Sequence, residues 1–133
     1  MKRIAFLNSR YIEFKNAKIH IEDRGLQFSD SVYEVVPFYN YNLIDFDFHF
    51  LRLKFSLKQL NIKYYPKKIY LNNIFKKLIK INNLKSGIIY LQVTRGVQDR
   101  DHTYKNNLKP NVIIYLQKKL LNIFLKKIKA KKA

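Results

Sequence analysis

The sequence predicts an α+β domain in which an antiparallel sheet carries two packed helices. Short segments near the N-terminus and after Gly87 alternate apolar and polar residues, the two-residue period of strands with one buried face. Between them, two stretches repeat apolar residues every three or four positions, which is typical of amphipathic helices. Strand patterns on both sides of two helical patterns favour an α+β architecture.

The N-terminal part predicts a meander of strands. Asn8 and Ser9 form a turn signal between the first two segments, and Ile19 and Ile21 alternate with polar neighbours in the third. Pro37 interrupts a β-branched and aromatic run and predicts an edge or bulged strand, because proline cannot donate to a ladder. The strands are expected over residues 3–8, 11–14, 18–22, 32–39 and 43–46.

The middle of the chain predicts two helices and two further strands. The first helix begins near Asp47, capped by Asp45 or Asp47, with Lys54 and Lys58 one turn apart on its solvent side. Its apolar side comprises Phe50, Leu51, Leu53, Phe55, Leu57 and Leu60. The second helix follows Pro66, which fits a first helical turn, and ends near residues 82–83. The dense apolar patterns of 88–94 and 111–116 complete the sheet.

We expect one domain over residues 1–116, followed by a basic amphipathic helix over 117–133. In that helix Leu120, Phe124 and Ile128 share one face, opposite several lysines. This segment is a tail or the start of an interdomain connection. Its apolar face is expected to dock on the rest of a protein or on the chain's own sheet, with binding to a membrane surface as the alternative.

Composition excludes several classes of function. The chain has 133 residues and no cysteine, so a disulfide framework, a thiolate nucleophile and a cysteine-ligated metal are excluded. No apolar run reaches the roughly 20 residues that a transmembrane helix requires, and no signal-like apolar core develops at the N-terminus. A cytoplasmic location is expected.

The net charge of +18 raises nucleic-acid binding as an alternative, because phosphate neutralisation dominates such affinity. Lysine greatly outnumbers arginine, however, and accompanies many Ile, Asn, Tyr and Phe residues, the set that an AT-rich coding sequence favours. No acidic residue occurs between His49 and Gln98, which makes the middle of the chain strongly basic but does not indicate a specific ligand. A solvated lysine-rich surface is therefore preferred, and a basic nucleic-acid-binding or protein-interaction module stays open.

Four residues are candidates for binding chemistry. Arg100 and His102 stand two apart after a strand, so an extended backbone would place a guanidinium beside an imidazole, a pairing suited to a carboxylate. Tyr33 is expected to share a strand face with Val35. Arg52 lies between two leucines and is expected to be partly buried, either binding a phosphate or pairing with Glu34, Asp45 or Asp47.

Standard catalytic and metal motifs are not found. The three glycines are scattered, which excludes a glycine-rich phosphate loop, and no nucleophile elbow occurs. The histidines His20, His49 and His102 lack metal-ligand spacing.

The order and spacing of several motifs resemble the N-terminal domain of D-amino-acid transaminases, the fold-type IV pyridoxal-phosphate aminotransferases. The resemblance extends from about residue 4 to 116. It rests on the following motifs: Asp23-Arg24-Gly25, Tyr33-Glu34-Val35, His49 with Arg52-Leu53, Tyr90 through Arg95-Gly96, and Arg100-x-His102. The last pair resembles the D-amino-acid branch in particular.

This resemblance implies a set of roles. Arg52 would contact the phosphate of pyridoxal phosphate. Tyr33, Arg100 and His102 would trap the substrate α-carboxylate, with Arg100 and His102 reaching into the partner's site of a homodimer. The family reaction moves the amino group of D-alanine-like substrates to 2-oxoglutarate.

The family's second domain, with its Schiff-base lysine, has no counterpart motif in the sequence, so no catalytic residue is nominated. We expect a truncated transaminase that is inactive alone, with a split enzyme completed by a second polypeptide, or a reused binding domain, as alternatives.

Three glycine positions of the family are changed. The family's Phe-Gly-Asp-Gly is here Phe28-Ser29-Asp30-Ser31, and its turn glycine after Asn40 is Tyr41. Where such a glycine has a positive φ, the replacement is expected to strain the turn by about 1 kcal/mol or more.

Overall fold

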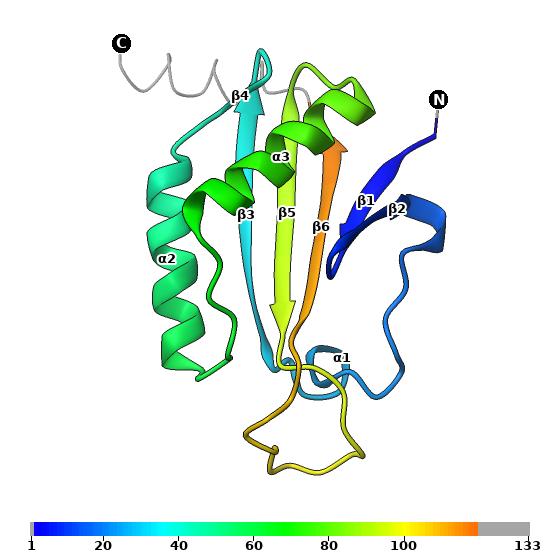
Figure 1. Cartoon of the computed structure of the whole chain (residues 1–133), viewed down its shortest axis with the longest axis vertical. Helices are drawn as coiled ribbons and strands as arrows, with labels where there is room; N and C mark the ends of the chain where they lie inside the picture. The colour runs from blue at the N-terminus through cyan, green and yellow to red at the C-terminus, as the bar shows by residue number, and fades with distance from the viewer. Residues whose placement is uncertain (1, 120–133) are drawn as a thin grey trace.

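A computed structural model describes residues 2–119 of the chain (Figure 1). Its sheet has six strands in the order β2-β1-β6-β5-β3-β4, and every neighbouring pair is antiparallel. The strands are β1 (Ile4–Leu7), β2 (Arg10–Glu13), β3 (Ser31–Tyr39), β4 (Asn42–Leu43), β5 (Gly87–Thr94) and β6 (Asn111–Lys118). The predicted α+β fold, an antiparallel sheet with two packed helices, is confirmed.

Two helices, α2 (Phe46–Gln59) and α3 (Lys68–Asn82), pack on one face of the sheet. Figure 1 shows α2 beside β3 and β4, and α3 crossing the sheet obliquely. The core forms between these layers, because alternate residues of β3, β5 and β6 face the apolar sides of both helices. Its side chains with the least exposure include Phe38, Phe75, Leu71, Leu78, Ile89 and Ile114. Two short elements, η1 (Phe14–Asn16) and α1 (Arg24–Phe28), connect β2 to β3.

The predicted strand over 18–22 is wrong. Residues 17–20 have no regular structure, residues 21–22 form a turn, and Ile21 is 77% exposed. The alternation of Ile19 and Ile21 finds no partner strand, because β2 forms the edge of the sheet and η1 turns the chain away from it. The strand predicted over 43–46 is also much shorter, since α2 already begins at Phe46.

Pro37 lies on β3, the second strand from the edge of the sheet, and no bulge occurs there. The register between β3 and β5 is unbroken from Ser31 opposite Thr94 to Phe38 opposite Gly87. On its other side β3 pairs with the two-residue strand β4 through Phe38 and Tyr39, and the Pro37 carbonyl accepts the Ile44 N–H at 2.9 Å. The predicted edge or bulged strand is therefore wrong, because β4 forms the edge and the ladder to β5 is regular.

The helix ends differ from the sequence prediction in detail. Asp45 occupies the cap position of α2 with φ 54°, but its side chain makes no capping hydrogen bond. Asp47 lies in the first turn and pairs with Lys68 of α3. Pro66 lies before the helix, because α3 begins at Lys68 with Lys67 as its cap residue. The predicted end of α3 is confirmed.

The apolar side expected for the first helix was too broad. Phe50, Leu53 and Leu57 are buried, whereas Leu51 and Phe55 are exposed. Phe46, which the sequence prediction assigned to a strand, completes the buried stripe of α2.

Two of the three changed glycine positions have a left-handed backbone. Ser29 (φ 54°) caps the end of α1, and Tyr41 (φ 66°) follows Asn40 in the turn between β3 and β4. Ser31, by contrast, is an ordinary strand residue at the start of β3. The expected strain thus applies to Ser29 and Tyr41, because a side chain at positive φ is disfavoured.

The predicted boundary at residue 116 falls inside β6, which continues to Lys118. The helix predicted over 117–133 lies outside the described residues from residue 120 onward. Among the residues that the structure describes, none of the helices has the length and apolar character needed to span a bilayer.

Candidate anion-binding site

The candidate site is built on a junction at one end of the sheet, formed by residues 23–31 and 94–104. We call this the junction. Figure 1 shows α1 and the chain between β5 and β6 at the same end of the sheet. The Arg24 N–H donates to the Gly96 carbonyl at 2.9 Å, and the Arg95 N–H donates to the Asp30 carbonyl at 3.1 Å. Two segments that are distant in sequence are thus joined through their backbones.

Asp23 is the buried polar centre of this junction. One carboxylate oxygen accepts the Gly25 N–H at 2.8 Å, and the other accepts the Thr94 hydroxyl at 2.7 Å and the Asn111 amide at 2.6 Å. A fully buried carboxylate requires such partners, because unpaired burial is costly. A Cβ at Gly25 would lie 2.6 Å from the Thr94 methyl group, which explains the glycine.

Beside Asp23, two buried arginines share the carboxylate of Asp30. The Nε atoms of Arg24 and Arg95 lie 2.8 and 2.6 Å from Asp30 Oδ2. Burial alone would raise the pKa of Asp30, but the hydrogen bonds and charges of Arg95 and Arg24 together hold that pKa below its usual value. Arg95 also donates to the carbonyls of Leu60 and Asn61, which links the junction to the end of α2.

Arg100 and His102 meet at one aromatic ring of the junction. The Phe28 ring centroid lies 5.3 Å from the His102 ring and 5.2 Å from the Arg100 guanidinium carbon. The Arg24 guanidinium donates to the carbonyls of Asp101 and His102 from below. The backbone here is bent rather than extended, so the condition under which the two side chains would share a face is not met, yet both lie near the same ring and are exposed.

Tyr33 shares a face of β3 with Val35, as predicted, and this face lies opposite the helices. Its ring is 62% exposed and stacks at 5.8 Å on Tyr90 of β5, which in turn lies 5.2 Å from Tyr115 of β6. Burial, followed by the neighbouring tyrosines, raises the pKa of Tyr90. Among the described residues, no hydrogen bond or ring contact joins Tyr33 to Arg100 or His102 within one chain.

Arg52 is paired with Glu34, one of the partners expected from sequence. Its Nε lies 3.0 and 2.9 Å from the two oxygens of Glu34, and His49 Nδ1 lies 2.8 Å from the same carboxylate. This pairing raises the pKa of Arg52. The predicted partial burial is wrong, because the side chain is 65% exposed. It projects from the solvent side of α2, while Leu53 takes the buried position.

Arg52 retains donors for a phosphate. Its Nε and Nη2 face Glu34, and Nη1 makes no hydrogen bond to the residues that the structure describes. A guanidinium that is fixed along one edge by a carboxylate can donate hydrogen bonds to phosphate oxygens from its open edge. The described part of the chain contains no group of three acidic or histidine side chains that could bind a metal ion.

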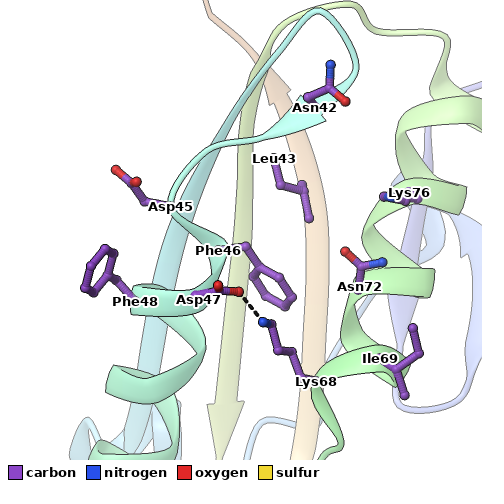
Figure 2. Close-up of a pocket in the computed structure, with 10 residues that line it drawn as sticks. All are labelled: Asn42, Leu43, Asp45, Phe46, Asp47, Phe48, Lys68, Ile69, Asn72 and Lys76. Carbon is purple, nitrogen blue, oxygen red and sulfur yellow. Dashed lines mark ion pairs between the residues drawn. The ribbon is translucent and has the colours of Figure 1, made fainter.

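A cleft of about 800 Å³ lies elsewhere, between the start of α2 and α3. Figure 2 shows Asp47 and Lys68 facing each other across it, with Phe46 turned toward α3 and Phe48 turned away. None of the four predicted site residues lines this cleft. The cleft and the junction are therefore separate features.

Sequence reasoning missed the roles of Arg24, Asp30 and Arg95. One signal could have indicated them: only six of the 27 basic residues are arginine, so each arginine is informative in this lysine-rich chain. Arginine offers a planar set of donors that lysine cannot reproduce.

Comparisons with known proteins agree with the predicted resemblance. Residues 31–130 match the model of the family described as amino-transferase class IV. The chain is 41% identical over 108 residues to a D-alanine aminotransferase of Bacillus licheniformis, covering 81% of this chain and 38% of that protein. It is 34% identical over 113 residues to a D-alanine aminotransferase of Staphylococcus haemolyticus, covering 83% of this chain and 39% of that protein. The chain thus spans about two fifths of the length of these relatives.

Solved structures show the same fold at lower identity. A branched-chain amino acid aminotransferase from Escherichia coli superposes with a TM-score of 0.81 at 21% identity, over 88% of this chain and 41% of that chain. A branched-chain aminotransferase from the thermophilic archaeon Thermoproteus uzoniensis, solved with norvaline, gives a TM-score of 0.77 at 16% identity, over 88% of this chain and 41% of that chain. A 4-amino-4-deoxychorismate lyase from Pseudomonas aeruginosa gives 0.68 at 20% identity, over 88% and 40%.

Proposed function

Because this chain belongs to the class IV aminotransferase family, we propose that it forms the N-terminal part of a D-amino-acid transaminase and supplies its substrate-carboxylate site. The proposed reaction transfers the amino group of D-alanine or a similar D-amino acid to 2-oxoglutarate. The observation that carries this proposal is the placement of Arg100 and His102 against the same ring, that of Phe28.

This pair suits a carboxylate. The Arg100 guanidinium can donate two parallel hydrogen bonds to the two oxygens, and the His102 imidazole can add a third donor. The Phe28 ring limits the directions in which both side chains can move. Holding the α-carboxylate in one place determines which face of the α-carbon meets the catalytic base, which would produce selectivity for one enantiomer.

Tyr33 completes the proposed site from another subunit. Within one chain it stacks on Tyr90 rather than contacting Arg100 or His102. We therefore place Arg100 and His102 in the site of a partner subunit in a homodimer, where they would meet that subunit's Tyr33. An exposed hydroxyl on the open face of the sheet is available for such a contact.

Pyridoxal phosphate, when bound, supplies the electron sink that amino-group transfer requires. In this proposal Arg52 contributes Nη1 to its phosphate, while Glu34 and His49 hold the guanidinium in place. The lysine that anchors the cofactor in this family is not assigned to any described residue. We propose that a domain equivalent to the rest of the relatives' length supplies it, and that the 133 residues alone do not transaminate.

A chimera tests this proposal. Residues 1–118 would be joined to the segment that follows the matched region in the Bacillus licheniformis D-alanine aminotransferase, and D-alanine-dependent pyruvate formation would be measured with 2-oxoglutarate present. We expect activity in the chimera. Arg100→Ala is expected to lower kcat/KM about hundredfold, as the loss of a paired charged contact implies.

The matched control is Arg10→Ala, an exposed arginine on the edge strand β2. It should leave kcat/KM within about twofold, because an exposed charge far from the site contributes little. A folded chimera that binds pyridoxal phosphate but forms no pyruvate from D-alanine would contradict the proposal. Equal effects of the two substitutions would also contradict it.

A further inference from the structure

We propose that Arg24 is a positioning residue which, backed by Asp30, fixes the two peptide units on either side of His102 and so directs Arg100 and His102 toward one carboxylate. This inference rests on the proposed function, because it concerns the same site. Arg24 is 4% exposed and lies beneath the loop that carries the pair. It acts through the backbone of that loop rather than on the substrate.

Every nitrogen of the Arg24 guanidinium has a partner. Nε donates to Asp30, Nη1 to the Asp101 carbonyl and Nη2 to the His102 carbonyl at 3.1 Å. Two successive carbonyls bound by one planar group fix the two peptide units on either side of His102. The direction of the His102 side chain follows from these two peptides, and Arg100 is the residue before Asp101, next to the fixed segment.

The same guanidinium also contacts the Phe28 ring, against which both side chains lie. Its carbon lies 4.5 Å from the Phe28 centroid, and Phe28 contacts both Arg100 and His102. Arg24 therefore determines the position of the loop backbone and supports the aromatic surface against which the loop side chains rest. A cation above an aromatic face at this distance is favourable.

A second set of contacts fixes the far side of the loop. Arg95 shares Asp30 with Arg24, and its guanidinium carbon lies 3.5 Å from the Tyr104 ring centroid. The Asp101 carboxylate is turned back onto Thr103, accepting its N–H at 3.0 Å and its hydroxyl at 3.1 Å. This carboxylate is thus engaged within the loop.

The buried charges of the junction balance formally. Arg24 and Arg95 carry one positive charge each, and Asp30 and Asp23 supply one negative charge each. Arg24 is therefore expected to act on the loop through its hydrogen bonds rather than through an excess of charge.

Arg24→Lys distinguishes the role of the positive charge at this position from the role of the guanidinium in holding the loop. The lysine ammonium could still neutralise Asp30, but a single nitrogen cannot reach one carboxylate, two carbonyls and a ring face together. Arg24→Lys should therefore keep the domain folded while releasing the loop. If Arg24 served only to neutralise Asp30, the lysine variant would keep the wild-type loop order and carboxylate affinity.

The test uses the full 133-residue chain labelled for NMR, as wild type, Arg24→Lys and Arg24→Gln. Backbone relaxation of residues 100–104 and the ring-current shift of His102 beside Phe28 report on loop order. Titration with pyruvate, followed on the His102 ring signals, reports on carboxylate affinity. Amide exchange in β5 reports on the fold.

We expect both variants to lose the His102 shift and to raise the pyruvate Kd about tenfold, with Arg24→Lys keeping wild-type exchange in β5.

Arg3→Gln is the matched control. Arg3 also donates to a carbonyl, that of Leu116 at 2.6 Å, and also lies over an aromatic ring, 3.6 Å from the Phe14 centroid, but it is remote from the loop. It should leave the loop signals unchanged. Wild-type loop order and pyruvate affinity in Arg24→Lys would overturn the positioning role. If the wild-type chain binds no pyruvate, the carboxylate site itself is wrong, and the loop signals of Arg24→Lys alone then decide whether Arg24 holds the loop.

Discussion

The junction holds its charges inside the molecule, whereas the layer formed by α2 and α3 holds them outside. In the junction, Arg24 and Arg95 are buried, and both contact the Asp30 side chain, which is 12% exposed. In the helical layer the buried side chains are apolar except for Asn82, and lysines such as Lys76 and Lys80 face solvent. The ion pair between Asp47 and Lys68 in that layer is exposed on both sides.

This difference shows why the chain's net charge is a poor guide to its function. The charge of +18 comes mainly from lysines, whose exposed side chains make weak and interchangeable contacts. The buried arginines contribute few charges, but each one has specific partners at defined distances. The specific chemistry is therefore expected where the chain has a buried arginine rather than a lysine.

The largest expected effect lies in the helical layer. Phe75 is fully buried and packs at 5.3 Å on Phe46, so Phe75→Ala should lower the free energy of unfolding by about 4 kcal/mol. Urea denaturation of the two proteins measures this difference. Lys76→Ala on the neighbouring exposed position should change it by less than about 0.5 kcal/mol. Equal losses at the two positions would mean that the layer is not held by apolar burial.

A smaller loss is expected in the junction. Asp30→Asn preserves the side-chain size but leaves two buried guanidinium groups without a carboxylate, which should cost about 3 kcal/mol of unfolding free energy. Asp47→Asn breaks the exposed pair with Lys68 and should cost less than about 1 kcal/mol. Denaturation midpoints of both variants provide the comparison. A larger loss of unfolding free energy in Asp47→Asn than in Asp30→Asn would contradict this prediction.

The two serines in the junction should respond oppositely to glycine. Ser29 has φ 54°, so Ser29→Gly should raise the free energy of unfolding by about 1 kcal/mol through relief of strain. Ser31 is a strand residue whose hydroxyl accepts the Gln92 amide at 2.9 Å, so Ser31→Gly should lower it by about 1 kcal/mol. Thermal unfolding distinguishes the signs. Stabilisation by both changes would show that backbone conformation is not the cause.

Acid should affect the junction in a defined direction. The pKa of Asp30 is lower in the folded chain than in the unfolded chain, where it is about 4. Its contribution to stability is therefore complete above about pH 4 and is lost as the pH falls through the folded pKa. We expect the unfolding free energy of the wild type to decline below about pH 4 more steeply than that of Asp30→Asn. If the unfolding free energies of the two proteins, measured by urea titration, fell in parallel with pH, Asp30 would be excluded as the source of the acid sensitivity.

The longer strands and both helices could be predicted because their patterns are local. The alternation over 32–39 and 88–94 continues for several residues and buries one face, as the structure confirms. The pattern over 18–22 is of the same kind, but whether a strand forms there depends on a partner that local periodicity cannot reveal.

The candidate site, too, could be predicted only where its residues are close in sequence. Arg100 and His102 could be selected because they are two residues apart and chemically complementary. The contact of Arg24 with Asp101 spans 77 positions, so no local pattern could indicate it. Arg52 was expected to be partly inside because leucines flank it, yet helix geometry turns Leu53 inward and Arg52 outward.

The central claim, that Arg100 and His102 orient a D-amino acid by its carboxylate, is tested most directly by enantiomer preference. The ratio of kcat/KM for D-alanine to that for L-alanine would be measured in the chimera, with and without Arg100→Ala and His102→Ala. We predict a strong preference for D-alanine that falls at least about tenfold in each variant, because a loosely held carboxylate no longer determines which face of the α-carbon reacts. An unchanged ratio in both variants, or a preference for L-alanine in the parent chimera, would contradict the claim.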